Sequence, residues 1–171
     1  MILLIKTPNA INSLSMLTSY KLNTHFNQKY DSQSQEIRNR SRECLKWIQY
    51  KGDAKVQSNL VNIGNGRVMS IVISTAGGIG EEQDKEILDV LMHIQWVFKA
   101  LPKGSNDYPS FQPLPLLARR TEEQIEEEGA NEELEAQMKK NKYGSYIMIW
   151  ANKAKAAILN HFIHWSNIGP N

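Results

Sequence analysis

The chain has 171 residues, a formal net charge of +2 and one cysteine, which suits a single domain and excludes a framework of internal disulfide bonds. No apolar run approaches the ~18 residues that a membrane-spanning helix needs. The opening MILLIK is too short and wrongly flanked for a secretory signal. These features predict a cytoplasmic protein.

Charge is unevenly distributed along the chain. Residues 1–70 carry ten Lys/Arg against four Asp/Glu, residues 71–138 carry five against fourteen, and residues 139–171 carry five against none. Such blocks favour head-to-tail self-association, or an anionic partner for the two basic ends. Neutralisation within one molecule would explain the same pattern equally well.

Residues 1–35 indicate a loosely ordered N-terminal segment that ends in a polar linker. Their last part, NTHFNQKYDSQSQ, is rich in Asn, Gln and Ser and cannot bury enough surface to order itself. We therefore expect one folded domain over residues 36–171. Residues 32–48 allow a helix, although a strand that starts near Trp47 is an alternative.

The strongest β signal comes from two runs that flank the loop IGNG. AKVQSNLVN alternates, and RVMSIVIST is β-branched and nearly all apolar. Gly64, Asn65 and Gly66 supply the positive φ angles that a tight hairpin needs. The pattern predicts an antiparallel hairpin with strands near 54–62 and 67–75. The preceding WIQY could add a third strand.

Two helices are predicted from apolar stripes, and both are expected to pack on the hairpin. The first covers residues 81–100, where acidic residues in the first turn and Lys99 in the last turn match the helix dipole. Its stripe is Ile87, Val90, Leu91, Ile94, Val97 and Phe98. The second is C-terminal, with a seam of Ile147, Ala151, Ala154, Ile158, His161 and Trp165.

A proline-rich loop and an acidic segment separate these helices. Residues 101–118 hold four prolines and should be extended. Residues 121–138 hold eight glutamates and few large apolar residues, which predicts a solvated helical appendage divided by Gly129, or a docking face for a basic partner. The combined prediction is an α+β fold, in which an antiparallel β-hairpin or three-stranded meander packs against two main amphipathic helices and carries the acidic helical appendage.

Three groups of residues are candidates for binding. Basic residues near Trp47 could meet the phosphates of nucleic acid or of lipid head groups, or only solvate the surface: Arg38, Arg40, Arg42, Lys46 and Lys51. The C-terminal helix could pair with a partner helix or lie on an anionic membrane surface, rather than pack on its own domain, through Trp150, Lys153, Lys155, Phe162 and Trp165. The proline-rich loop could bind a host adaptor protein through Tyr108, Pro109 and Phe111.

No residue set indicates catalysis, a cofactor or a metal. His161 and His164 lack a third ligand of suitable spacing, and TAGGIG lacks the Gly-Lys-Ser/Thr of a phosphate loop. We therefore expect no catalytic, cofactor-binding or metal-binding residues and no cofactor.

The leading hypothesis is a non-enzymatic structural or interaction protein that forms homo-oligomers and contacts an anionic surface. A matrix-like or accessory protein of an RNA virus has such properties. One alternative is an RNA-binding regulator that uses Arg38–Arg42. A second is a small cytosolic enzyme with a site assembled from distant residues such as Cys44, His93 and Glu86.

Overall fold

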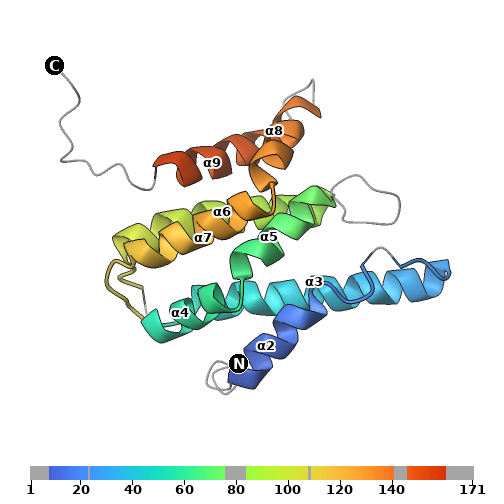
Figure 1. The fold of residues 1–171 in the computed structure, drawn as a ribbon, viewed down its shortest axis with the longest axis horizontal. Coiled ribbons are helices and arrows are strands. Elements are labelled where there is room, and N and C mark those ends of the chain that lie inside the picture. The colour runs from blue at the N-terminus through green and yellow to red at the C-terminus, as the bar shows by residue number, and fades with distance from the viewer. Residues whose placement is uncertain (1–7, 23, 76–83, 108, 141–145, 161–171) are drawn as a thin grey trace.

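The computed structural model describes residues 8–22, 24–75, 84–107, 109–140 and 146–160. Over these residues the chain forms eight helices and no strand (Figure 1). The helices are α2 (Pro8–Leu17), α3 (Gln28–Tyr50), α4 (Ala54–Asn62), α5 (Asn65–Ser74), α6 (Asp84–Lys103), α7 (Pro115–Glu127), α8 (Ala130–Lys140) and α9 (Tyr146–Asn160). The predicted α+β fold is therefore wrong, and the described part of the chain is all-α.

The predicted hairpin is a pair of helices, α4 and α5. Asp53 caps α4, because its side chain accepts a hydrogen bond from the Val56 N–H at 3.0 Å. Gly64 has the expected positive φ of 82°, but it joins two helices instead of two strands. Asn65 and Gly66, for which a positive φ was also expected, are the first residues of α5. The proposed third strand, WIQY, is the last turn of α3.

Burial explains why the β-branched run folds as a helix. Met69, Val72 and Ile73 lie on one side of α5 and are buried in the main core. Burying such a side chain contributes about 1.5–3 kcal/mol, whereas β propensities span only about 1 kcal/mol. Packing of the helix face therefore outweighs the local preference for a strand.

The two helices predicted from apolar stripes are confirmed. All six stripe residues of α6 are buried, and α6 continues through Pro102 in its last turn. In α9 the seam is buried at Ile147, Ala151, Ala154 and Ile158, whereas His161 and Trp165 lie outside the described residues. Helix α6 packs against α9, and their apolar faces form most of the main core.

The acidic segment is not an appendage. It forms α7 and α8, which Gly129 separates at φ 69°, as expected. Ile125, Ala130 and Leu134 are completely buried in the main core. These few apolar side chains suffice because each helix needs only one packed side, while the glutamates occupy the other sides.

The proline-rich loop is shorter than predicted, because α6 and α7 take up both of its ends. Between them, Ser105 and Phe111 pair as an isolated antiparallel bridge. Gly104 has a φ of 78°, and a Cβ there would lie 2.6 Å from the Phe111 carbonyl oxygen. The loop thus closes tightly over the end of α6.

The segment expected to be a polar linker contains α2 and the first turns of α3. Helix α2 packs against α3, and a second, smaller core forms beside the main one. This second core consists of Ile11, Leu45, Ile48, Val56 and Leu60. Figure 1 shows α2, α3 and α4 on one side of the molecule, α8 and α9 on the other, and α5, α6 and α7 between them.

Candidate functional site

A cleft of about 200 Å³ lies between α3, α5 and α6. Leu45, Val68, Met69 and Val90 contribute apolar side chains to its lining. The charged lining comes from Glu36, Arg40, Arg42, Glu43 and Lys46 on α3 and from Lys85, Glu86 and Asp89 on α6. The cleft therefore combines an apolar surface with groups of both charges.

The hydrogen bonding of Glu86, one of the carboxylates in this cleft, is incomplete among the described residues. Its Oε1 accepts a hydrogen bond from Asn39 Nδ2 at 3.0 Å, and Asn39 Oδ1 in turn accepts one from Arg42. Among the described residues, Glu86 Oε2 is buried without any hydrogen-bond partner. Because an unsatisfied buried polar atom costs about 1–3 kcal/mol, this carboxylate gains most from an added donor.

His93 is a buried residue of the cleft lining and is a neutral imidazole. Its Nε2 lies 2.8 Å from Gln49 Oε1, which also accepts a hydrogen bond from Asn65 Nδ2 at 2.7 Å. Because an amide oxygen only accepts, Nε2 carries the proton. Burial lowers the pKa of His93 from 6.5 to about 3, and the Lys46 ammonium adds to this effect.

Aromatic rings cover His93 on the side of α3. The Tyr50 ring packs edge-on against His93, with centroids 5.5 Å apart, and against Trp96 at 4.6 Å. Burial, with a smaller contribution from Asp89, raises the pKa of the Tyr50 hydroxyl above 10.0. Tyr50 and His93 are therefore both uncharged near neutral pH.

The predicted anion-binding residues do not form one patch. Arg40, Arg42 and Lys46 line the cleft, whereas Arg38 is buried and donates to the Tyr20 carbonyl at 3.3 Å. Lys51 is exposed at the end of α3. The five residues thus occupy three separate places on α3.

The three predicted anion-binding residues that line the cleft already have partners. The exposed Arg40 contacts Glu36 at 2.7 Å and Glu43 at 3.2 Å, and these contacts raise the pKa of its guanidinium. Arg42 donates to Asn39. Lys46 lies 3.6 Å from Asp89. An anion entering the cleft would have to compete with these contacts, and anion binding by these residues stays a prediction.

The turn between α2 and α3 exposes aromatic and apolar side chains. Of the twelve large apolar side chains that are exposed on the described residues, six lie between residues 16 and 37. We call this group the turn surface: Met16, Leu17, Tyr20, Phe26, Tyr30 and Ile37. Such a concentration is typical of a surface that contacts another macromolecule.

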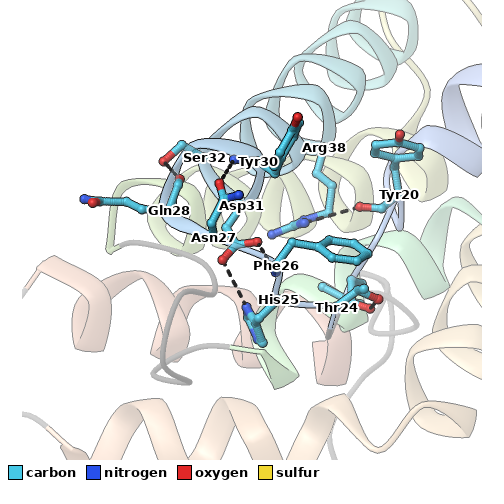
Figure 2. Close-up of polar contacts among 11 residues, drawn as sticks. Tyr20, Thr24, His25, Phe26, Asn27, Gln28, Tyr30, Asp31, Ser32 and Arg38 are labelled. Atoms are coloured by element: carbon cyan, nitrogen blue, oxygen red, sulfur yellow. Dashed lines mark hydrogen bonds and ion pairs between the residues drawn. The ribbon is translucent and has the colours of Figure 1, made fainter.

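Polar contacts hold the backbone beneath the turn surface in place. Figure 2 shows the Asp31 carboxylate reaching His25 and the Phe26 N–H, at 3.8 and 3.0 Å. Asn27 caps α3 by accepting a hydrogen bond from the Tyr30 N–H. The Lys21 ammonium lies 5.4 Å from the centroid of the Tyr20 ring and 5.2 Å from that of the Phe26 ring. The turn surface therefore has a defined shape and carries a cation between its rings.

A charged surface, separate from the turn surface, lies where α7 meets α8. We call it the acidic corner, and it consists of Glu126, Glu127, Glu128, Glu132 and Glu133. Arg67 contacts this corner through Glu127 at 2.6 Å and Glu128 at 3.5 Å. Among the described residues, five carboxylates against the one guanidinium that is seen to contact them leave the corner negative.

The C-terminal candidates are partly engaged in the fold. Trp150 is half-buried against the main core, and the Lys153 ammonium lies 4.2 Å from its ring centroid. Lys155 pairs with Glu135. Phe162 and Trp165 lie outside the described residues. This side of α9 therefore contributes to packing and ion pairing, and a partner-helix or membrane-surface role stays a prediction.

The adaptor-loop candidates also differ in their surroundings. Phe111 is buried in the main core, and Pro109 is half-buried. Tyr108 lies outside the described residues. A partner could not reach the Phe111 side chain without opening the loop, and binding to an adaptor protein stays untested.

No protein-family model matches the chain, and no curated protein or solved structure resembles it closely enough to count as a match. These comparisons therefore give no support to a viral, matrix-like or RNA-binding role. Among the described residues, no helix is both long and apolar enough to cross a membrane. The same residues contain no group of three His, Cys, Asp or Glu side chains placed to hold a metal.

The cleft could be anticipated only in part. Glu86 and His93 are seven residues apart on a predicted helix, so their shared side of α6 follows from sequence. Cys44, which the enzyme hypothesis combined with them, is exposed and does not line the cleft. No sequence signal indicated that Asn39 and Gln49 of α3 would face this side of α6, because the contact depends on helix packing.

Proposed function

We propose that this chain is an interaction protein that associates head to tail, with the turn surface of one copy against the acidic corner of a second. The observation that carries the proposal is the concentration of exposed apolar side chains between residues 16 and 37. Two of these side chains, Phe26 and Tyr30, are 66% and 54% exposed. Large aromatic side chains of this kind supply most of the binding energy in protein interfaces.

Charge supports a second copy as the partner. The turn surface is flanked by the exposed cations Lys21 and Lys29, and the acidic corner offers complementary carboxylates. In Figure 1, α2 and α3 lie on the side of the molecule opposite α8, and the acidic corner begins at the end of α7 that joins α8, so the two surfaces belong to different layers of one molecule. Complementary charge between the two surfaces would set their orientation and speed their encounter.

The arrangement determines the kind of assembly. Two different surfaces make a heterologous contact, which produces rings or open filaments instead of a closed symmetric dimer. A stable contact of this kind buries about 1,200–2,000 Å² in total. We therefore expect a series of oligomers whose size rises with concentration and falls with salt.

The test is the light-scattering mass over a range of concentrations, between about 0.01 M and about 1 M salt, where the screening length falls from about 30 Å to about 3 Å. Phe26→Ser should weaken association at least about tenfold. Leu116→Ser is the matched control, because Leu116 is 75% exposed but lies on α7. A monomer under all conditions, or equal association of both variants with the wild type, would contradict the proposal.

A charge exchange tests the partner. Glu132→Lys and Lys21→Glu should each weaken association, because each places like charges across the contact. The double variant should recover part of the loss, since it restores opposite charges in reversed order. Additive losses without recovery would show that these two residues do not face each other.

A further inference from the structure

We infer that the cleft between α3, α5 and α6 binds a small organic molecule through a protonated amine, which Glu86 and Asp89 hold together. The inference does not rest on the proposed self-association, because the residues that line the cleft are not part of the turn surface. It concerns a separate, ligand-binding role for the same chain.

The two carboxylates are placed to share one cation. Glu86 and Asp89 are three residues apart on α6, so they lie on the same side of the helix, and both line the cleft. Asn39 occupies only Oε1 of Glu86, and Oε2 is buried without a partner among the described residues. The terminal torsion of a glutamate is soft, so a small rotation turns Oε2 toward an incoming donor.

Asp89 retains acceptor capacity. Its side chain is 49% exposed, and its Oδ1 lies 3.6 Å from Lys46 Nζ, which is longer than a hydrogen bond. An ammonium group carries three donors and no acceptor, so it can reach both carboxylates at once. A neutral donor lacks this charge, so its hydrogen bonds to the two carboxylates would be weaker than those of an ammonium group.

The formal charges of the lining balance, so hydrogen bonding and not net charge favours a cation. Arg40 and Arg42 donate hydrogen bonds to acidic or amide side chains of the lining. Lys46 is ion-paired with Asp89 at 3.6 Å, and Lys85 is exposed. His93 in the lining is uncharged, so it does not repel a cation. A bound cation would complete the hydrogen bonding of Glu86, whereas an anion held by Arg40, Arg42 or Lys46 would have to displace existing contacts.

The size and the apolar lining define the rest of the ligand. A volume of about 200 Å³ is below the range of about 300–1,000 Å³ found for drug-sized ligands, so the molecule must be small. Leu45, Val68, Met69 and Val90 offer contact to a short aliphatic chain. The expected class is therefore short primary alkylamines in their protonated form.

Titration with n-butylammonium chloride, followed by the methyl NMR signals of Met69 and Val90, tests the inference. We expect saturable shifts of these signals in the wild-type protein. Sodium butyrate, which has the same chain length and the opposite charge, should cause none at matched ionic strength. Glu86→Gln should bind at least about tenfold more weakly, because it removes the charge at nearly constant shape. Glu123→Gln is the control, since Glu123 is an exposed glutamate on α7.

Several results would overturn the inference. These are equal binding by Glu86→Gln and the wild type, saturable shifts with butyrate instead of butylammonium, or no saturation of the Met69 and Val90 signals. If Glu86→Gln does not fold, Asp89→Asn replaces it, because Asp89 is half exposed and tolerates substitution better. Undiminished binding by Asp89→Asn would then overturn the shared-cation arrangement.

Discussion

The two sides of α6 differ in what they contact. One side packs against α7 and α9 with apolar residues such as Leu91, Ile94 and Phe98, all buried. The other side faces α3 across the cleft with Glu86, Asp89 and His93. Apolar contact is non-directional and stabilises the fold, whereas the polar side depends on individual partners. One helix thus carries an apolar side that stabilises the fold and a polar side that lines the cleft.

The largest expected effect is on the apolar side. Leu91→Ala removes a completely buried side chain and leaves a cavity, so the free energy of unfolding should fall by about 2–5 kcal/mol. Urea denaturation measures this change. Met92→Ala is the neighbouring control, because Met92 is 40% exposed, and it should change the free energy of unfolding by less than about 0.5 kcal/mol. Equal effects of both variants would contradict the orientation of α6.

The next largest effect comes from His93, on the polar side of α6, and it makes the free energy of unfolding depend on pH. Folding holds the pKa of His93 at about 3, below the 6.5 of an ordinary histidine. Between these values the unfolded chain binds a proton that the folded chain does not. Stability should therefore fall by roughly 1.4 kcal/mol per pH unit as the pH drops below 6.5. Above 6.5 this contribution does not change.

His93→Gln isolates this contribution. The glutamine side chain can still donate a hydrogen bond to Gln49, but it does not titrate. Urea denaturation at about pH 7 and about pH 5 should show a smaller loss of stability in the variant than in the wild type. Equal losses would mean that His93 is charged or accessible in the folded protein.

The smallest effect concerns the hydrogen bond between Asn39 and Glu86 across the cleft. Asn39→Ala removes the donor to Glu86 Oε1, so the free energy of unfolding should fall by about 0.5–1.5 kcal/mol. Asn152→Ala is the control, because Asn152 is exposed and donates to the carbonyl of Met148 on its own helix. A combined Asn39→Ala and Glu86→Gln variant should lose less than the sum of the single losses. Strict additivity would show that the two side chains do not interact.

The fold was predictable where the apolar pattern left one interpretation. Helices α6 and α9 each follow a stripe of period near 3.6, and both stripes are buried over the described residues. The same reasoning failed for α4 and α5, because short apolar runs such as RVMSIVIST fit a buried helix side as well as a strand. Gly64 was correctly expected to adopt a positive φ, but such a glycine serves helix ends as readily as hairpins.

The candidate site was less predictable than the fold. The basic residues of α3 were recognised as a group, yet their alternation around the helix places Arg38 near Tyr20 and Arg42 in the cleft. The turn surface was not predicted, because the polar composition around Phe26 and Tyr30 indicated a linker. The signal that could have found it is Asn27, a good N-cap residue followed three positions later by Tyr30.

The sequence by itself determined the periodic apolar sides of α6 and α9, the breaks at Gly64 and Gly129, and the separation of charge along the chain. These features depend on neighbouring residues, whose spacing is visible in one dimension. Only the tertiary structure decided that the β-branched run would be helical and that α3 would bring Asn39 to Glu86. Both depend on which surfaces meet, and burial between distant segments outweighs the local preferences that a sequence displays.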